Sequence, residues 1–257
     1  MRILSVGDLI GESGLKKAQE VVEKIKEEEN IDFIIVNGEN VAEGMGINQK
    51  YFNTILSMGT NVVTMGNHTW AKKDIFTFID HEKLIRPANY PEGVPGKGYV
   101  ICECNDKKIA VLNLIGRTEM GVLSENPFVI GKKIAEKLKK EADIIVVDFH
   151  AEASAEKVAL GNYLDGIATI VYGTHTHVQT ADDRILPEGT AYMTDIGMTG
   201  PKNSVIGMDV SASLKRFVTT LPERYKMAEG ECIFNGVVFS VNDENCRTEK
   251  ITRIFIK

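Results

Sequence analysis

The sequence has no hydrophobic run long enough to cross a membrane and no excess of positive charge. Nothing in it approaches the roughly 18 consecutive apolar residues that a membrane span requires. Lys and Arg number 30 against 36 Asp and Glu, which gives a net charge of −6. A global basic field that would attract nucleic acid is therefore missing, and we expect neither a nucleic-acid nor a membrane partner. The chain enters strand-like sequence at once, without a signal peptide, which favours a cytoplasmic protein.

Cysteine is scarce, and several common catalytic motifs are absent. The four cysteines stand at 102, 104, 232 and 246, and a single C-x-C makes a poor zinc site. We interpret them as reduced structural thiols. The sequence contains no G-x-x-x-x-G-K-[ST], no spaced G-x-G-x-x-G and no G-x-S-x-G. These absences argue against a phosphate loop, a dinucleotide-binding turn and a serine hydrolase.

What the sequence does contain is a regular alternation of apolar strands and amphipathic helices. With 257 residues, 43% of them hydrophobic and 26% charged, the composition is that of a globular protein, and we predict one α/β domain over residues 1–257. Strands are predicted at 2–7, 33–37, 61–65, 98–104, 108–113, 144–149, from 170, at 191–194, 232–241 and 248–256. Helices are predicted from Gly14 and at 49–57, 128–141, 155–164 and 211–219, and a glycine-rich loop is predicted from 195 through Pro201.

Polar residues follow these strands where each strand ends. They are Asp8, Glu39, Asn40, Asn67, His68, His150, His175 and His177, which include four of the five histidines. In parallel α/β sheets, the carboxyl ends of the strands are where ligands bind. Two carboxylates, two amides and several imidazoles can hold two metal ions with one carboxylate bridging them, a centre suited to in-line displacement at phosphorus. Ligand type alone does not choose among iron, manganese and zinc.

Within this set, the pair His175 and His177 is the most typical of a metal site. Side chains alternate along an extended chain, so both imidazoles are expected on the same side of a strand. Asn40 and Asn67 have an alternative interpretation as turn residues. Asp148 and Asp195 could orient imidazoles or serve ordinary structural hydrogen bonding.

The ordered series of short motifs resembles a known superfamily. Gly7-Asp8, Gly38-Glu39-Asn40, Gly66-Asn67-His68, His150 and Gly173-Thr174-His175-Thr176-His177 resemble, in this order, the motifs of calcineurin-like metallophosphoesterases. Longer strings are similar to its YmdB-like bacterial phosphodiesterase branch: VNGEN (36–40), TMGNHTW (64–70), RPANYPEG (86–93), DFHAEA (148–153), GTHTHVQTADDRILPEGTAY (173–192) and TDIGMTGP (194–201). The resemblance covers residues 1 to about 210.

The resemblance implies a fold and an activity. The implied fold is a two-sheet mixed β-sandwich flanked by helices, in four layers α-β-β-α, although strand–helix units alone would also permit a flavodoxin-like layer. The implied protein is a homo-oligomeric phosphodiesterase with two metal ions per chain, iron or manganese, with zinc as a further option. It would hydrolyse small phosphodiesters such as 2′,3′-cyclic nucleotides by attack of a metal-activated hydroxide.

The resemblance also implies roles for individual residues. Asp8, Glu39, Asn40 and His177 would hold the first metal, and Glu39, Asn67, His150 and His175 the second, with His68 as the general acid. Two positions depart from the superfamily pattern. Ile10 stands where a histidine is usual, so Asn40 would replace that ligand, and Thr69 stands where an acidic residue usually follows the Gly-Asn-His triplet.

Two other functions fit the same motifs. A phosphomonoesterase, such as a nucleotidase or a protein phosphatase, would use the same metal centre with different pocket walls. A metal-loaded nucleotide or RNA sensor with little turnover is the alternative outside the enzymes. Loops 86–96 and 116–126 are expected to shape the pocket.

Overall fold

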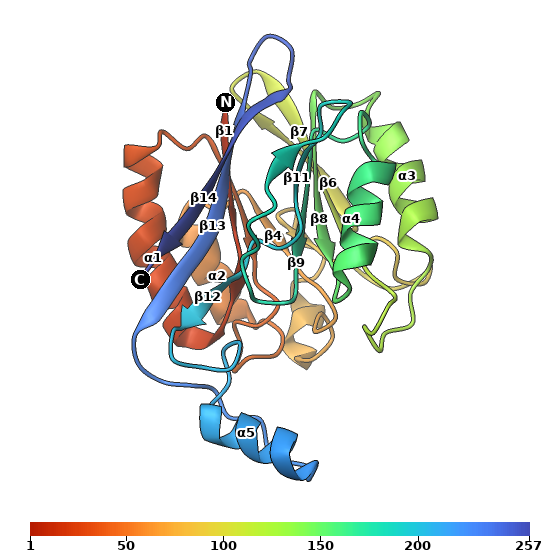
Figure 1. Ribbon diagram of the computed structural model, residues 1–257. Coiled ribbons are helices and arrows are strands. Elements are labelled where there is room, and N and C mark those ends of the chain that lie inside the picture. Colours follow the sequence, from red (N-terminus) through yellow and green to blue (C-terminus); the bar gives the residue numbers. More distant parts are fainter.

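A computed structural model describes residues 1–257, which form two β-sheets with helices on their outer faces (Figure 1). The first sheet has eight strands, in the order β2 (Asp8–Leu9), β12 (Met198–Pro201), β13 (Cys232–Val241), β1 (Arg2–Val6), β3 (Phe33–Asn37), β4 (Val62–Thr64) and β5 (Leu84–Ile85), with β14 (Thr248–Ile256) beside β13. The second has six, in the order β10 (Arg184–Ile185), β11 (Ala191–Met193), β9 (Ile170–Thr174), β8 (Ile144–His150), β7 (Lys107–Ile115) and β6 (Tyr99–Cys104).

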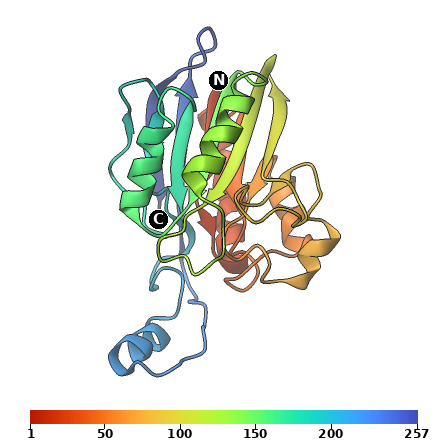
Figure 2. The same cartoon turned by 90° about the vertical axis from the view of Figure 1, so that its right-hand side faces the viewer.

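The helices lie outside the two sheets. Helices α1 (Gly11–Glu28) and α2 (Gln49–Ser57), with the short 3-10 helix η1 (Lys73–Thr77), pack against the first sheet. Helices α3 (Pro127–Leu138) and α4 (Ser154–Tyr163) cover the second, as Figure 2 shows from the side. Helix α5 (Val210–Thr219) is set apart from both sheets. No helix is both long and apolar enough to cross a membrane.

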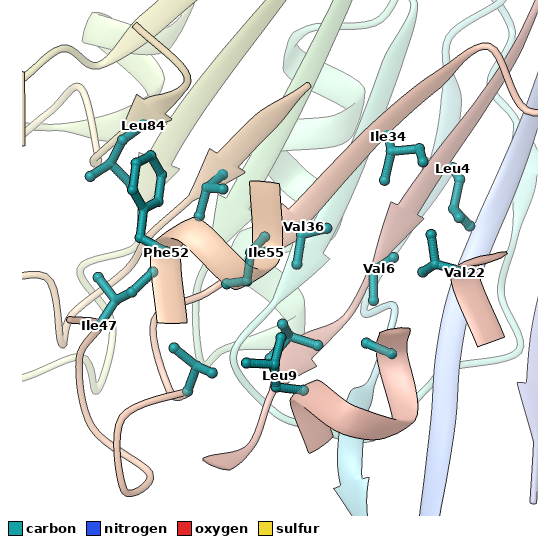
Figure 3. Close-up of a cluster of buried hydrophobic side chains, with 14 of the residues drawn as sticks. Leu4, Val6, Leu9, Val22, Ile34, Val36, Ile47, Phe52, Ile55 and Leu84 are labelled. Carbon is teal, nitrogen blue, oxygen red and sulfur yellow. The ribbon is translucent and has the colours of Figure 1, made fainter. Parts of the chain in front are cut away.

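Alternation of side chains along the central strands explains why two sheets form. Ile3 of β1 and Phe33 of β3 face the core between the sheets, whereas Leu4 and Ile34 face the core beneath α1 (Figure 3). Each of these strands buries apolar side chains on both faces, so each needs a covering layer on both sides. The predicted four-layer α-β-β-α arrangement is confirmed, and a single flavodoxin-like sheet is excluded.

Strand direction decides where the site lies. In the first sheet β1, β3, β4 and β5 are parallel, and in the second β7, β8, β9 and β11 are parallel. The carboxyl ends of each parallel set therefore emerge at one edge of its sheet. The antiparallel strands β13 and β6 pair with β1 and β7, and they leave the carboxyl ends of the parallel strands together at the same edge.

The main strands and helices were predicted within a few residues, but one segment was assigned wrongly. The stretch from 198 to 201 was predicted as a glycine-rich loop, whereas it forms strand β12 between β2 and β13. Gly200 is needed there because an added Cβ would lie 2.7 Å from the Cβ of Ile10. Close packing, rather than turn formation, accounts for a glycine in this strand. The prediction of one domain over residues 1–257 stays a prediction.

Phe239 offers a test of the core between the sheets. Its side chain is fully buried and stacks on Tyr172 of the opposite sheet with ring centroids 6.1 Å apart. We expect Phe239→Ala to lower the free energy of unfolding by about 3–5 kcal/mol, measured by urea denaturation, because it opens a cavity between the layers. Phe255→Ala on β14 is the matched control, since that ring is 52% exposed. Equal losses from both variants would contradict the assignment of the inter-sheet core.

Candidate active site

The eight strand-end residues that the sequence singled out converge at one edge of the two sheets. Asp8 lies in β2 directly after β1, Glu39 and Asn40 follow β3, and Asn67 and His68 follow β4. From the second sheet come His150, the last residue of β8, and His175 and His177, which follow β9. Asp8, Glu39 and His150 are completely buried. Both sheets thus contribute side chains to a single polar cluster.

Glu39 lies at the centre of this cluster. One oxygen, Oε1, lies 3.1 Å from Nε2 of His150 and 3.3 Å from both Nδ1 of His68 and Nδ2 of Asn40. The other, Oε2, accepts a hydrogen bond of 3.1 Å from the backbone N–H of His68. A single carboxylate therefore contacts residues from both sheets.

Asn40 gathers the first group of predicted ligands. Its amide nitrogen Nδ2 lies 3.4 Å from Asp8 Oδ1, 3.3 Å from Glu39 Oε1 and 3.2 Å from His177 Nε2. A cation at this position would satisfy the same three acceptors. The amide nitrogen thus occupies a position whose surroundings suit a metal ion.

His150 and His175 form the second group with Glu39. Their side chains offer one ligand atom each within 4.8 Å of one another. Nε2 of His150 lies 3.0 Å from Nδ1 of His175 and 2.9 Å from Oδ1 of Asn67. These are the four residues predicted for the second metal.

The prediction that His175 and His177 lie on the same side of a strand is wrong, although both residues line the pocket of the site. Strand β9 ends at Thr174, and both histidines have left-handed backbone angles, with φ of 99° and 64°. They do not alternate along a strand: His175 contacts His150, whereas His177 contacts Asn40 and approaches Asp8. The sharp turn sends one imidazole to each group of ligands.

Burial and charge explain the protonation of the cluster. Burial raises the pKa of Asp8. Burial alone would also raise the pKa of Glu39, but His150 and His68 hold it well below its ordinary value. Burial alone would lower the pKa of His150, yet Glu39 and Asp8 raise it to about 9. Burial and the neighbouring His150 lower the pKa of His175 to about 3. The raised pKa of His150 shows that the carboxylates of Glu39 and Asp8 favour a positive charge beside them.

Glycine at position 66 permits the approach of the two sheets. An added Cβ there would lie 2.3 Å from Glu39 Oε2 and 2.4 Å from His150 Nε2. Thr69 fixes the same turn, because its hydroxyl donates to the Gly66 carbonyl at 2.6 Å. Thr69 therefore supports the backbone beneath His68, and the imidazole itself is oriented by Asn40 Oδ1, 2.7 Å from Nδ1. Ile10 is buried in the core and plays no part in the cluster.

Two buried aspartates support the histidines in different ways. Asp148 accepts a 2.7 Å hydrogen bond from the Thr174 hydroxyl, which in turn lies 2.9 Å from Nδ1 of His150. Asp148 thus orients an imidazole through one intervening hydroxyl. Asp195 contacts no imidazole: it pairs with buried Lys157 at 2.6 Å and accepts the Thr176 backbone N–H at 3.1 Å. It holds the turn between the two histidines.

The pocket walls come largely from segments that the sequence did not indicate. A pocket of about 360 Å³ is lined by Glu39, Asn40, Asn67, His68, His175 and His177, and its other lining includes Met45, Glu152, Ile206, Met208 and Tyr225. Glu152 contacts His175 directly, with Oε2 3.1 Å from Nε2. Loops 86–96 and 116–126, predicted to shape the pocket, do not line it. No periodic pattern in the sequence marks these wall residues. Ile206, Met208 and Tyr225 reach the pocket only because residues 205–228 fold back toward the strand ends.

Comparison with solved structures identifies the fold class of this protein. A solved phosphatase from Mycoplasma pneumoniae superposes with a TM-score of 0.94 at 35% identity, covering 100% of this chain and 93% of that one. The NAD nucleotidase of Haemophilus influenzae shares the fold alone, with a TM-score of 0.63 at 13% identity over 100% of this chain and 56% of the other. The two sheets and their shared edge are those of a metallophosphoesterase.

The family is more specific than the fold. A family model described as "YmdB-like protein" matches residues 4–254. The 2′,3′-cyclic-nucleotide 2′-phosphodiesterase of Bacillus subtilis is 49% identical over 257 residues, covering 100% of this chain and 97% of that protein. The chain belongs to the YmdB-like family and is a phosphoesterase. The resemblance recognised in the motifs is thereby confirmed.

The pair Lys157 and Asp195 gives a test of how the histidine turn is held. We expect Lys157→Met to lower the free energy of unfolding by about 3–5 kcal/mol, because it leaves a buried carboxylate without its counter-charge. The double variant Lys157→Met/Asp195→Asn removes both charges and should recover part of that loss, measured by urea denaturation as a double-mutant cycle. Identical losses in the single and double variants would show that the two side chains do not act as a pair.

Proposed function

We propose that the protein is a phosphodiesterase with two metal ions per chain that hydrolyses 2′,3′-cyclic nucleotides. The observation that carries this proposal is the placement of Glu39 between two groups of ligand-type side chains. Asp8, Asn40 and His177 lie on one side of it, and Asn67, His150 and His175 on the other. Mixed oxygen and nitrogen ligation of this kind suits iron, manganese or zinc. We propose iron or manganese as the bound metals.

The metals, when bound, would polarise the phosphate and activate water for attack. The chain would supply the remaining chemistry. His68 is 26% exposed at the pocket and keeps Nδ1 against Asn40 and Glu39. Its other ring nitrogen, Nε2, is then the atom that would donate a proton to the leaving oxygen. Its partners fix the ring plane before substrate enters, which reduces the entropy lost in reaching the transition state.

The apolar part of the pocket lining supports a nucleotide as substrate. Met45, Ile206, Met208 and Tyr225 add apolar and aromatic side chains to the polar residues that line the pocket. A small number of polar groups with apolar and aromatic walls is the usual composition of a pocket for a nucleoside-sized ligand. The Bacillus subtilis relative acts, by its name, on 2′,3′-cyclic nucleotides. We also propose a cytoplasmic location, with which the four free cysteines agree.

A phosphomonoesterase is the second candidate, favoured by the Mycoplasma pneumoniae relative, which is described as a phosphatase. The same ligand cluster would serve both reactions, so substrate preference has to be measured. A sensor with little turnover is less well supported, because a binding protein has no need of a partly exposed histidine held beside the ligand cluster.

The catalytic assignment is tested by His68→Ala. We expect turnover of a 2′,3′-cyclic nucleotide and of bis-p-nitrophenyl phosphate to fall about 10²–10⁴-fold, the usual contribution of a general acid. Metal content, measured by inductively coupled plasma mass spectrometry, should stay at the wild-type value. His81→Ala is the matched control, since His81 is an exposed histidine that packs on Phe52, outside the cluster.

Three outcomes would contradict parts of this proposal. Wild-type turnover in the metal-loaded His68→Ala variant would remove His68 from the mechanism. Preference of the wild type for p-nitrophenyl phosphate would favour the monoesterase. Absence of turnover on every ester by protein with two metals bound would favour the sensor.

A further inference from the structure

The carboxylate of Glu152 lies at the pocket of the candidate site but is not one of the predicted ligands. Glu152 follows β8 and precedes α4, and its side chain lines the pocket beside the ligand cluster. Its Oε2 lies 3.1 Å from Nε2 of His175, and the side chain is 50% exposed. The backbone N–H of Glu152 donates to the sulfur of Met120 at 3.2 Å, which holds this part of the loop.

The hydrogen bond to His175 fixes where this charge lies. A neutral imidazole has one N–H group and one lone pair. When Nε2 donates to Glu152, the lone pair is on Nδ1, which lies 3.0 Å from Nε2 of His150. The width of one imidazole ring thus separates the Glu152 carboxylate from the second group of predicted ligands.

The pocket has no positively charged side chain that would offset this carboxylate. Of its 13 lining residues, Glu39 and Glu152 are acidic and none is a lysine or an arginine. Arginine and lysine are the side chains with which proteins usually bind phosphate groups. An exposed carboxyl group is negatively charged at neutral pH, so Glu152 adds repulsion toward anions in a pocket that lacks a basic side chain.

Phosphodiesters and phosphomonoesters differ in the charge that meets this carboxylate. A diester carries one negative charge, whereas a monoester loses a second proton near about pH 6 and then carries two. Coulomb repulsion from a neighbouring carboxylate is therefore about twice as large for the monoester. In a partly solvated pocket, one additional unit charge roughly 10 Å away changes a binding constant about tenfold.

We propose that the negative charge of Glu152 makes this site prefer phosphodiesters to phosphomonoesters. The inference rests on the proposed function, because it concerns which esters occupy the same pocket. Hydrolysis adds water across one P–O bond: the hydroxyl joins phosphorus, the proton joins the leaving oxygen, and the new monoester releases a second proton to solvent. Glu152 repels this doubly charged product more strongly than the substrate, so it also favours product release.

The test compares Glu152→Gln with the wild type at about pH 8, where monoesters and inorganic phosphate are dianions, and at equal metal content. Glutamine keeps an oxygen that can accept from Nε2 of His175, so the substitution removes only the charge. We expect the ratio of kcat/KM for p-nitrophenyl phosphate to kcat/KM for bis-p-nitrophenyl phosphate to rise about tenfold. Calorimetric titration with inorganic phosphate should show about tenfold tighter binding to the variant.

Two further variants separate the effect of charge from that of structure. Glu103→Gln removes an exposed carboxylate from β6, where Glu103 pairs in register with Lys108 near the start of β7, at the opposite end of the sheet from the site. This control should keep the wild-type ester ratio and phosphate affinity. Glu152→Ala removes both the charge and the hydrogen bond to His175, so turnover of both esters should fall while the ratio shifts as in Glu152→Gln.

An unchanged ester ratio or an unchanged phosphate affinity in Glu152→Gln would overturn the proposal. A ratio that changes only in Glu152→Ala would overturn it as well, because the orientation of His175 would then set the preference. Phosphate binding needs no turnover, so it tests Glu152 separately from the proposed function. A wild type that hydrolyses neither ester would contradict the proposed function, and the phosphate affinities would still decide the role of the charge.

Discussion

Burial of one carboxylate is the constraint on which this structure depends. Glu39 is removed from water, yet each of its oxygens has a partner, and these partners come from the strand ends of both sheets. Its negative charge would be costly without nearby positive charge or hydrogen-bond donors. In the absence of metal, His150 and His68 supply this stabilisation. Bound metal ions would stabilise the negative charge of Glu39 more strongly. The packing of the two sheets, the glycine at 66 and the turn at His68 all serve this arrangement.

The fold follows from strand direction, and the site follows from the fold. Parallel strands deliver their carboxyl ends to one edge, so residues far apart in sequence, such as Asp8 and His177, come within 3.8 Å. Rigid neighbours then set the orientation of each side chain. Thr174 links His150 to Asp148, and Asp195 fixes the backbone between the two site histidines of the β9 turn. Such support is what holds ligands in place before a metal binds.

Much of this could be predicted from the sequence, for identifiable reasons. Apolar runs ending in Asp, Glu, Asn or His marked the site residues, because strand ends are where parallel sheets place ligands. The turn geometry at His175 and His177 could not be predicted, since left-handed backbone angles at non-glycine residues leave no periodic signal. Lys157 looked like an ordinary helix residue, and only the structure shows its side chain buried beside Asp195. The pocket wall from Ile206 and Tyr225 depends on tertiary packing that no local pattern encodes.

In the proposed function, Glu39 is a ligand of both metal ions. The most direct measurement is calorimetric titration of manganese into metal-free wild-type protein and into Glu39→Gln, which keeps the shape of the side chain and removes its charge. We expect two manganese ions per chain to bind the wild type and both ions to bind the variant more weakly. One site that retains full affinity in a folded Glu39→Gln protein would contradict this expectation, because Glu39 would then serve only one ion.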